Sequence, residues 1–281
     1  MKNTDSEETA RLRTIAWIGL GRIGLPMAAR LAAAGFAVRG FDIDPQRRSA
    51  AEKRGIRVSE NLEGADLVFT SMPTEEALLQ LAGRLDLGDA LLVETSTIGP
   101  HASKRISERI GPYLRAPISG STTLAEAGTL TVFASGPRAA FEKAKGALAA
   151  FSRAQIWLGE GEEARYAKLA VNLMVAVTAG MMGEALALAT KGGIGWEAIL
   201  DVIGESAVGS PLVKYKLDPL KRRDFTPAAT NALVKKDLDL IVAAAKAAGV
   251  PVPLAEHMHS VYQGLLAAGR GEEDFFSAAK P

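Results

Sequence analysis

The amino-acid sequence predicts an α/β protein with a doubly wound parallel sheet in its N-terminal part and an all-helical C-terminal part. Up to about residue 158, short apolar runs alternate with stretches of helical periodicity. That alternation is the pattern of a parallel sheet covered by helices on both faces. After residue 164 only helical periodicity remains, in stretches rich in Ala, Leu, Met and Lys. The change of pattern predicts two domains of different architecture.

Six apolar runs are expected to form the strands. Few polar residues interrupt them, as is typical of parallel strands buried on both faces. The expected strands are residues 14–19, 37–43, 66–71, 90–94, 131–135 and 155–158. The expected helices between them are residues 25–34, 45–54, 75–82, 100–110 and 137–151.

The domain boundary is expected near residues 159–163. We therefore predict a disordered polar tail at residues 1–13, a sheet-containing domain at 14–161 and an all-helical domain at 162–281. A long helix over residues 164–190 opens the second domain. Its most apolar stretch, residues 169–189, contains Asn172 and Glu184, so a buried helix is expected there rather than a membrane span.

Composition excludes several classes of function. The chain has 281 residues, with 33 lysines and arginines against 32 acids, so neither nucleic acid nor a membrane is an expected partner. The absence of cysteine excludes disulfides and thiolate sites and fits a cytoplasmic protein. The first thirteen residues contain no apolar run typical of a secretory signal. The three histidines lack metal-ligand spacing, so no metal site is expected.

The first candidate site is the sequence Gly19-Leu20-Gly21-Arg22-Ile23-Gly24, which closes a predicted strand and opens a predicted helix. In such a loop Gly19 permits the tight turn, Gly21 lets the backbone approach a pyrophosphate, and Gly24 allows close helix–strand packing. The amides at the helix start would then bind phosphate. The alternative is a plain glycine turn without a ligand.

Asp42 ends the next predicted strand, eighteen residues after Gly24. A carboxylate there can accept hydrogen bonds from the adenosine ribose hydroxyls and would repel a 2′-phosphate. The sequence therefore predicts a nicotinamide dinucleotide cofactor, NAD in preference to NADP. Arg47 and Arg48 could offset Asp42 by pairing with a phosphate, although a solvated helix face is the simpler explanation of them.

Lys168 and Asn172 form the second candidate site. Their spacing of four places them on one face of the long helix. A lysine can give a proton to a carbonyl oxygen while hydride arrives at carbon, and an asparagine can orient the same oxygen or the lysine. From spacing alone, a lysine at the helix boundary and an asparagine bonded to a neighbouring loop is the favoured interpretation.

Six motifs together resemble the β-hydroxyacid dehydrogenase family, which includes 3-hydroxyisobutyrate dehydrogenase, tartronate semialdehyde reductase and the glyoxylate and succinic semialdehyde reductases. In order they are Gly19-Leu20-Gly21-Arg22-Ile23-Gly24-Leu25-Pro26-Met27, Ser71-Met72-Pro73, Glu94-Thr95-Ser96-Thr97, Ala116-Pro117-Ile118-Ser119-Gly120, Lys168-x-x-x-Asn172 and Lys236-Asp237. The resemblance covers nearly the whole chain after residue 13. It implies a Rossmann domain followed by an all-helical domain.

The resemblance also implies roles for single residues. Lys168 would be the catalytic acid/base, and Asn172 would support it. Substrate would be bound by Ser96, Ser119, Gly120 and Lys236. Cofactor would be bound by Gly19, Leu20, Gly21, Arg22, Ile23, Gly24, Asp42, Met72, Pro73, Thr97 and Lys236. Without the resemblance, Ser119-Gly120 would be interpreted as a loop turn and Lys236 as an exposed helix lysine.

Three departures from the family pattern stand near these residues. Arg115 replaces an Asp that often precedes the Ala-Pro-x-Ser-Gly-Gly motif, and Ser121 replaces the second glycine of that motif. Residues 161–167, Gly-Glu-Glu-Ala-Arg-Tyr-Ala, stand where the family usually has Gly-x-Gly. These changes leave the pair Lys168 and Asn172 intact.

The predicted function is an NAD(P)-dependent oxidoreductase that interconverts a small hydroxy acid and its oxo acid or semialdehyde, with Lys168 as acid/base. One alternative is an imine reductase-type oxidoreductase, against which Lys168 argues because imine-reducing relatives tend to replace this lysine. Another is a non-catalytic dinucleotide-binding module. The expected partners are a small-molecule substrate and further copies of the chain, as a homodimer or homotetramer, because the helical half is apolar and contains Met174, Met181 and Met182.

Overall fold

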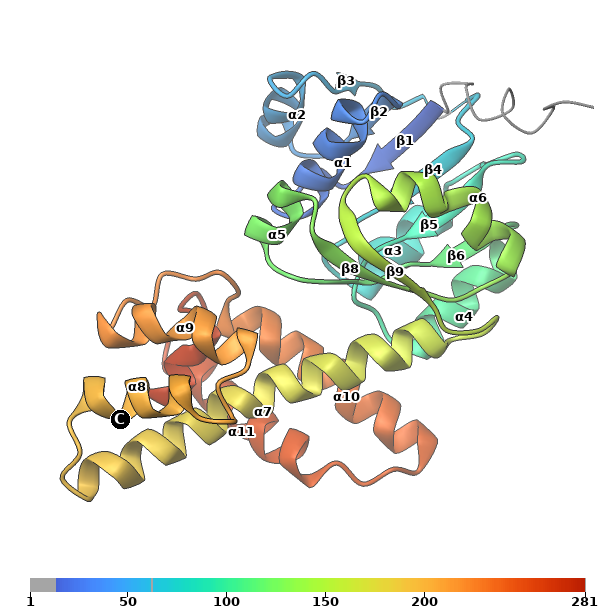
Figure 1. Cartoon of the computed structure of the whole chain (residues 1–281). Coiled ribbons are helices and arrows are strands. Elements are labelled where there is room, and N and C mark those ends of the chain that lie inside the picture. Colours follow the sequence, from blue (N-terminus) through green and yellow to red (C-terminus); the bar gives the residue numbers. More distant parts are fainter. Residues whose placement is uncertain (1–13, 62, 281) are drawn as a thin grey trace, which may run out of the picture. The chain divides into compact units, whose positions relative to one another are not determined.

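The computed structural model describes residues 14–61 and 63–280 (Figure 1). The tail predicted at residues 1–13 lies outside the described residues. The chain divides into two compact units, the first ending at Lys168 and the second beginning at Leu169.

The first unit contains a six-stranded parallel sheet with the strand order β3-β2-β1-β4-β5-β6. Its strands are β1 (Thr14–Ile18), β2 (Ala37–Phe41), β3 (Arg57–Val58), β4 (Leu67–Thr70), β5 (Leu91–Glu94) and β6 (Tyr113–Arg115). The order reverses between β1 and β4, and ligands of such sheets bind outside the carboxyl ends of the strands at that point. The predicted Rossmann architecture is confirmed.

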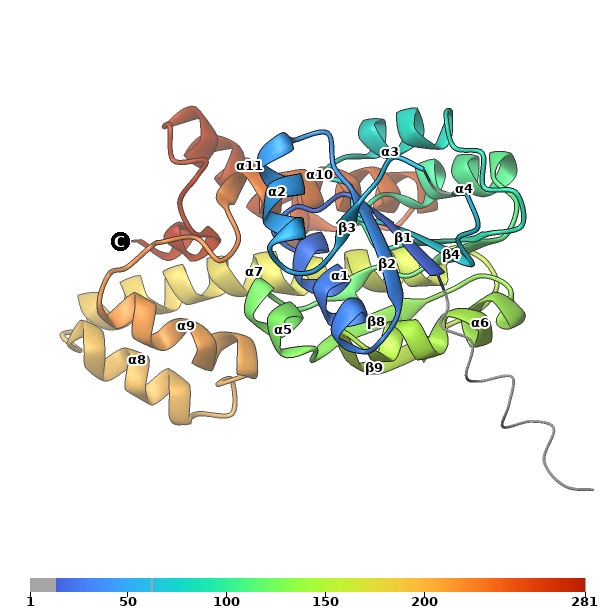
Figure 2. The same ribbon diagram turned by 90° about the horizontal axis from the view of Figure 1, so that it is seen from above.

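Helices cover both faces of this sheet because its strands alternate apolar side chains between the two faces. On one face Trp17 and Phe69 pack with residues of α1 (Gly24–Ala33) and α6 (Arg138–Ala149). On the other face Ile18 and Val68 pack with residues of α3 (Glu75–Ala82) and α4 (Pro100–Arg109). Figure 2 shows the two helix pairs on opposite sides of the strands. The remaining helix, α2 (Pro45–Glu52), contacts β2 and β3 and is capped by Asp44.

The last two predicted strands of this unit do not join the main sheet. They are β8 (Leu130–Ala134) and β9 (Ser152–Trp157), which form a separate three-stranded sheet with β7 (Ile118–Ser119). β7 and β8 are antiparallel, so the expectation of a single parallel sheet is wrong here. The short connection between them, which contains α5 (Thr122–Ala127), suits an antiparallel pair, whereas a parallel crossover needs a dozen or more residues.

The second unit is all-helical, as predicted. Its helices are α8 (Trp196–Glu205), α9 (Pro211–Lys221), α10 (Asn231–Ala248), α11 (Pro253–Ala267) and the 3₁₀ helix η2 (Phe275–Ala279), together with most of α7 (Glu163–Lys191). Within the described residues of this unit, the β-structure consists of one isolated bridge between Thr230 and Asp274.

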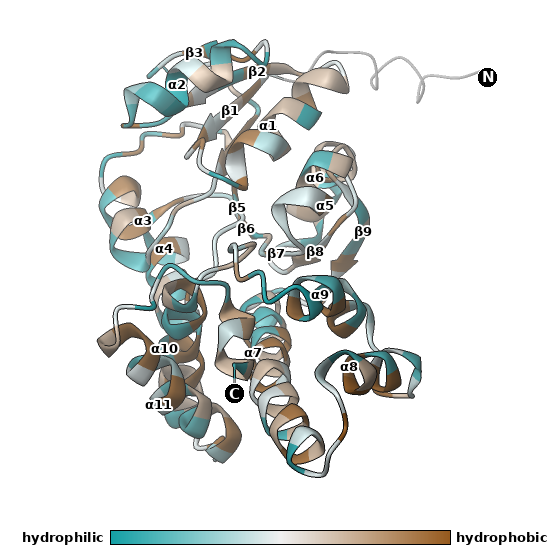
Figure 3. Cartoon of the chain, turned by 90° about the vertical axis from the view of Figure 1, so that its left-hand side faces the viewer, coloured by the Kyte–Doolittle hydropathy of each residue, from teal (hydrophilic) through white to brown (hydrophobic). Residues whose placement is uncertain are grey.

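The burial expected for the apolar helix α7 is wrong for one of its faces. By length and composition alone the helix could cross a membrane, yet only 22% of its most apolar 18-residue window is buried in the chain. Ala179 and Met182 lie in the core of the second unit, whereas Met174, Met181 and Leu188 are 68%, 58% and 78% exposed. Figure 3 shows the apolar character of this helix. The apolar sequence of α7 shows that the helix is hydrophobic overall. It does not show which of its faces packs against other helices of the same chain.

Candidate functional site

The glycine-rich loop between β1 and α1 leaves no room for side chains at two of its glycines. Gly19 has a φ of +94°, and a Cβ built there would lie 2.2 Å from the carbonyl oxygen of Ser71. A Cβ on Gly24 would lie 2.0 Å from the carbonyl oxygen of Gly19, which also accepts a hydrogen bond from the Trp17 indole at 3.0 Å. The loop geometry therefore depends on the tight turn and the close packing expected of these glycines.

Gly21 differs from the other two glycines because its missing side chain leaves open space. The nearest atom to a Cβ at Gly21 would be Nη1 of the flexible Arg47 side chain, at 3.6 Å. The loop leads into the first turn of α1, where the backbone N–H groups point out of the N-terminal end of the helix. These features fit a bound pyrophosphate, which needs close backbone approach and amide donors.

Asp42 lies next to this loop and is only 5% exposed. Its Oδ2 accepts the Leu20 amide at 2.8 Å, and its Oδ1 accepts the Asp44 amide at 2.9 Å. The carboxylate therefore fixes the loop and lies beside it, at the position predicted from the sequence.

Arg47 and Arg48 both contact the Asp42 segment, while Arg47 remains exposed to solvent on α2. Arg47 Nη1 lies 3.4 Å from Asp42 Oδ2, with half of the Arg47 side chain exposed. Arg48 Nη1 donates to the carbonyl oxygens of Asp42 and Ile43 at 2.8 and 3.2 Å. The two arginines thus place positive charge beside the carboxylate expected to choose the cofactor.

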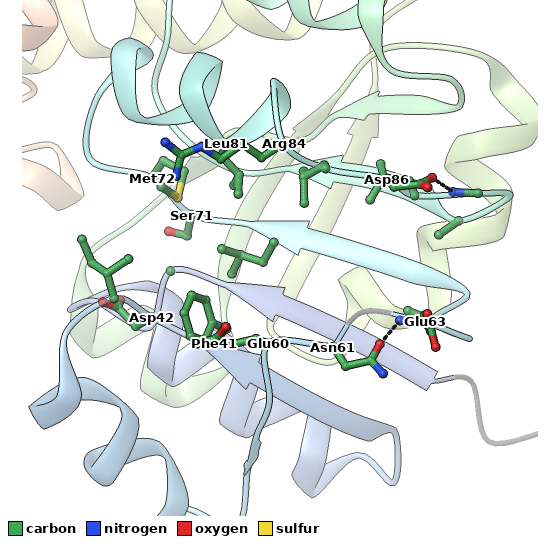
Figure 4. Close-up of a pocket in the computed structure, with 18 of the residues that line it drawn as sticks. Phe41, Asp42, Glu60, Asn61, Glu63, Ser71, Met72, Leu81, Arg84 and Asp86 are labelled. Carbon is green, nitrogen blue, oxygen red and sulfur yellow. Dashed lines mark hydrogen bonds between the residues drawn. The ribbon is translucent and has the colours of Figure 1, made fainter.

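A cavity of about 1090 Å³ opens beside these residues in the first unit (Figure 4). One part of its lining comes from the carboxyl ends of β1 and β2 and from the loop after β4, which is the expected place for a ligand of this fold. Most of the rest comes from α3 and from the segments that precede β4 and β5. The lining includes Gly19, Asp42, Ile43, Arg47, Met72 and Pro73. The cavity therefore joins the glycine-rich loop to two of the residues expected on the nicotinamide side.

Ser96 connects two of the predicted site segments. Its Oγ accepts the Met72 amide at 2.7 Å, which joins the loop after β4 to the loop after β5. Ser96 is nearly fully buried, whereas Thr97 beside it is partly exposed. The structure thus brings Met72 and Ser96 together as a single wall.

A buried cluster behind this wall was missed by sequence reasoning. Arg165, in the first turn of α7, is fully buried and forms an ion pair with the fully buried Glu94 at the end of β5. Arg165 also donates to the Ser96 carbonyl oxygen at 2.9 Å and to the Tyr113 hydroxyl at 2.8 Å. Burial raises the pKa of the Tyr113 hydroxyl, so that hydroxyl stays neutral at physiological pH. A charged residue three positions before Lys168 was the available signal for this cluster.

A second group of predicted site residues lies on α7 and α10. Asn172 Nδ2 donates to Asp237 Oδ2 of α10 at 2.7 Å, and Lys236 Nζ lies 3.1 Å from Asp237 Oδ1. Asn172 is therefore bonded to a helix and not to a loop, and the Lys236 side chain is only 28% exposed. Lys168 lies one turn before Asn172 on α7 and is partly buried.

Ser119 ends β7, and Gly120 lies between β7 and α5. Gly120 has a φ of +138°, and a Cβ there would lie 2.6 Å from the Leu130 side chain, so glycine is required at this turn. The neighbouring Ser121 accepts the Leu124 amide and caps α5. The serine that departs from the family pattern thus has a local structural role.

Two other departures from the family pattern contact one another. Arg115 Nη2 donates to Glu162 Oε1, and both side chains are largely buried. The pair joins the end of β6 to the segment before α7. Arg115 and Glu162 therefore neutralise each other in a largely buried position.

Comparisons with known proteins match almost the whole described chain. Residues 14–159 match the family model for the NAD binding domain of 6-phosphogluconate dehydrogenase. Residues 162–281 match the model described as NAD-binding of NADP-dependent 3-hydroxyisobutyrate dehydrogenase. Each model corresponds closely to one of the two parts of the chain.

Individual proteins give the same result. The chain is 30% identical to 2-(hydroxymethyl)glutarate dehydrogenase of Eubacterium barkeri, over 95% of this chain and 93% of the relative. It is 30% identical to Mycobacterium tuberculosis 3-hydroxyisobutyrate dehydrogenase, solved with L-serine, with a TM-score of 0.86 and coverage of 95% and 98%. An imine reductase from Pseudomonas sp. is 20% identical, with a TM-score of 0.63 and coverage of 95% and 98%, which shows a shared fold alone.

The contact between Gly24 and Gly19 gives a first prediction. Gly24→Ala should lower the thermal midpoint and weaken NADH binding, because its Cβ would meet the Gly19 carbonyl at 2.0 Å and displace the loop. Differential scanning calorimetry and NADH fluorescence titration measure both effects. Gly146→Ala is the matched control, since nothing lies within 4 Å of its Cβ in the exposed face of α6 and alanine there should add up to about 1 kcal/mol. Equal behaviour of the two variants would contradict the prediction.

Proposed function

The chain belongs to the β-hydroxyacid dehydrogenase family, and from this we propose that Lys168 and Asn172 carry proton transfer in its reaction. The enzyme is an NAD(P)-dependent oxidoreductase that interconverts a small hydroxy acid and its oxo acid or semialdehyde. Its cofactor is NAD, with NADP as the alternative. Family membership favours this activity over imine reduction and over a non-catalytic dinucleotide-binding role.

One observation supports the proposed roles above the others. A carboxylate can only accept hydrogen bonds, so the bond to Asp237 fixes the Asn172 amide with its nitrogen toward Asp237. The Asn172 oxygen is then available to another donor. The Lys168 ammonium, one helical turn earlier, is a donor of the right kind, and a substrate hydroxyl is a second.

The proposed mechanism follows from these positions. A nicotinamide dinucleotide, when bound, would supply the hydride for reduction or accept it in oxidation. During reduction negative charge grows on the carbonyl oxygen, and Lys168 stabilises this charge and gives the oxygen a proton. During oxidation Lys168 removes the hydroxyl proton. Asn172 orients the lysine or the substrate oxygen, and its contribution is geometric.

The remaining site residues are proposed as binding groups. The loop Gly19-Leu20-Gly21-Arg22-Ile23-Gly24 and Asp42 would hold the pyrophosphate and the adenosine ribose. Met72, Pro73 and Thr97 would contact the nicotinamide side of the cofactor. Ser96, Ser119 and Gly120 would hold the substrate, and Lys236 would contact substrate or cofactor.

We propose that the two parts of the chain have different functions. Residues 14–161 would bind the dinucleotide, and residues 162–281 would supply substrate contacts and the subunit interface. The boundaries of the two family models, 14–159 and 162–281, support this division. The absence of cysteine supports a cytoplasmic location.

We propose that the substrate is a small acid carrying a hydroxymethyl group or the corresponding semialdehyde. The named activities of the two 30%-identical relatives support this class. Hydroxy acids and semialdehydes, with amines and imines as the competing class, should be assayed by NAD(P)H absorbance. Activity confined to imines would overturn the proposal, and activity with none of them would favour the non-catalytic alternative.

Substitution of Lys168 tests the catalytic proposal. Lys168→Ala should lower kcat by a factor of about 10² to 10⁴, the usual contribution of general acid–base catalysis. Lys168→Arg should also fail, because a guanidinium does not release its proton near neutral pH. Asn172→Ala should be milder, because this residue orients and does not transfer. NADH fluorescence titration is the control, because the dinucleotide affinity of Lys168→Ala should stay near that of the parent. Near-native kcat in Lys168→Ala would refute the role.

Cofactor choice gives a separate prediction. The parent enzyme should have a higher kcat/KM with NAD than with NADP, because Asp42 would repel the 2′-phosphate. Asp42→Asn should reduce the NAD-to-NADP ratio by about tenfold or more, since a charged hydrogen-bond acceptor is lost. Arg47→Ala should lower the remaining NADP activity if Arg47 pairs with that phosphate. A clear preference of the parent for NADP would refute the assignment of Asp42.

The exposed face of α7 leads us to propose a homodimer or homotetramer. Met174, Met181 and Leu188 repeat at seven-residue spacing, which aligns them along one side of a helix. A stripe of this kind is characteristic of helix packing between copies of a chain, because exposed apolar patches mark interaction sites.

Sedimentation tests this interface. Met181→Glu combined with Leu188→Glu should convert the oligomer to smaller species, because both charges would be buried without partners. Val208→Glu is the matched control, since Val208 is 69% exposed in the same unit but lies outside α7. A parent protein that sediments as a monomer at micromolar concentration would refute oligomerisation. An oligomer unaffected by the double substitution would refute the α7 interface.

A further inference from the structure

The ion pair between Arg165 and Glu94 is the most deeply buried charge pair among the described residues. Both side chains are fully buried, and they join the first turn of α7 to the end of β5. Removing two charges from water is costly, and a buried pair often contributes no more stability than apolar residues of the same volume. Stability alone is therefore a weak explanation for this pair.

The pair holds the backbone of Ser96 at both its amide and its carbonyl group. Glu94 Oε1 accepts the Ser96 N–H at 2.5 Å, and Arg165 Nη1 donates to the Ser96 carbonyl oxygen at 2.9 Å. The Ser96 hydroxyl oxygen in turn accepts the Met72 amide at 2.7 Å. The two charges therefore fix the position of the wall that Ser96 forms with Met72.

The other bonds of Arg165 fix the guanidinium itself. Its Nη2 donates to the Tyr113 hydroxyl at 2.8 Å, and its Nε donates to Ser103 Oγ at 3.2 Å. Its partners thus come from β5, from the loop after β5, from α4 and from β6. A planar guanidinium can satisfy this many directions at once, whereas a lysine ammonium has no fixed fork.

We propose that the Arg165–Glu94 pair positions the loop of Ser96 relative to Lys168, which lies three residues after Arg165 on α7. This inference rests on the proposed function, because it takes Lys168 as the acid/base and Ser96 and Met72 as neighbours of substrate and nicotinamide. Arg165 anchors the start of the helix that carries Lys168. The same guanidinium and its carboxylate partner hold the opposing loop, so one pair sets the distance between the two.

Loss of the pair should slow catalysis more than it weakens cofactor binding. A misplacement of about 1 Å can cost on the order of 10²-fold in rate even when the reacting groups remain. The side-chain bonds of the pair described above go to Ser96, Ser103 and Tyr113, so the pyrophosphate loop and Asp42 should keep most of the dinucleotide affinity. The pair therefore acts as a positioning device and does not touch the reacting atoms.

The experiment compares two double variants. Glu94→Met with Arg165→Met removes both charges together, which avoids leaving one buried charge unpaired. Arg115→Met with Glu162→Met is the matched control, because that pair is also largely buried and also lies near the start of α7 but makes no bond to Ser96. Circular dichroism establishes folding. Steady-state rates, NADH titration and the isotope effect with 4-deuterated NADH are then measured.

We expect kcat of the Glu94/Arg165 double variant to fall by about 10- to 100-fold, with the NADH dissociation constant changed by less than about threefold. The deuterium isotope effect on kcat should rise, because a misplaced lysine makes the hydride step more rate-limiting. The control double variant should keep kcat within about twofold. Arg165→Lys should recover only part of the lost rate, since it restores the charge without the fork.

Several results would overturn the proposal. They are an unchanged kcat in a folded Glu94/Arg165 variant, an equal loss in the control, and a loss of NADH affinity as large as the loss of kcat. Full recovery by Arg165→Lys would overturn the positioning role of the guanidinium. If the double variant does not fold, Arg165→Lys alone decides, by its kcat and isotope effect. Lys168→Ala, measured alongside, separates the two proposals: its near-native activity refutes the catalytic role, whereas an inactive Lys168→Ala with an active double variant refutes positioning alone.

Discussion

The contact between Gly19 and Gly24 is the constraint on which the site of the first unit depends. The chain leaves the buried strand β1 and turns at Gly19, which has a φ of +94°. At the start of α1, a Cβ on Gly24 would lie only 2.0 Å from the Gly19 carbonyl oxygen. This turn puts the start of α1 next to the carboxyl end of β1, where the strand order reverses. Asp42 then fixes the loop through the Leu20 amide. The proposed cofactor site and the packing of α1 against the sheet therefore depend on the same few backbone atoms.

Periodicity predicted the elements that are long enough to repeat. The helix at residues 75–82 has apolar residues at helical spacing, and the pattern that predicted α7 continues over residues 164–190. The strands β3 and β7 have two residues each, and α5 has six. These elements are too short to show the alternation of a strand or the periodicity of a helix. The assignment of β8 and β9 to the main sheet failed because pairing partners are chosen in space, and a strand's own sequence does not state its direction.

The candidate site was predicted from the sequence only where its residues form local motifs. Gly19 to Gly24 act within one turn, and Lys168 and Asn172 are four residues apart. Glu94 and Arg165 are 71 residues apart, and each alone looks like a polar residue near the end of an element. Arg115 and Glu162 are similar, because each departs from the family pattern on its own and only the fold shows that they pair. Ion pairs between residues far apart in the sequence therefore could not be predicted from the sequence alone.

The roles proposed for Arg165 and Lys168 at the start of α7 have opposite chemical requirements, and the surroundings of the two side chains match that difference. A positioning charge must stay charged when buried, and arginine does so because its guanidinium does not lose its proton in proteins. Arg165 is accordingly buried and bonded to Glu94, Ser96, Ser103 and Tyr113. An acid/base must instead exchange its proton with substrate and solvent, and Lys168 is only partly buried. With Arg165 three residues before the proposed acid/base Lys168, a single helical turn would hold the geometry and still allow a proton to be released.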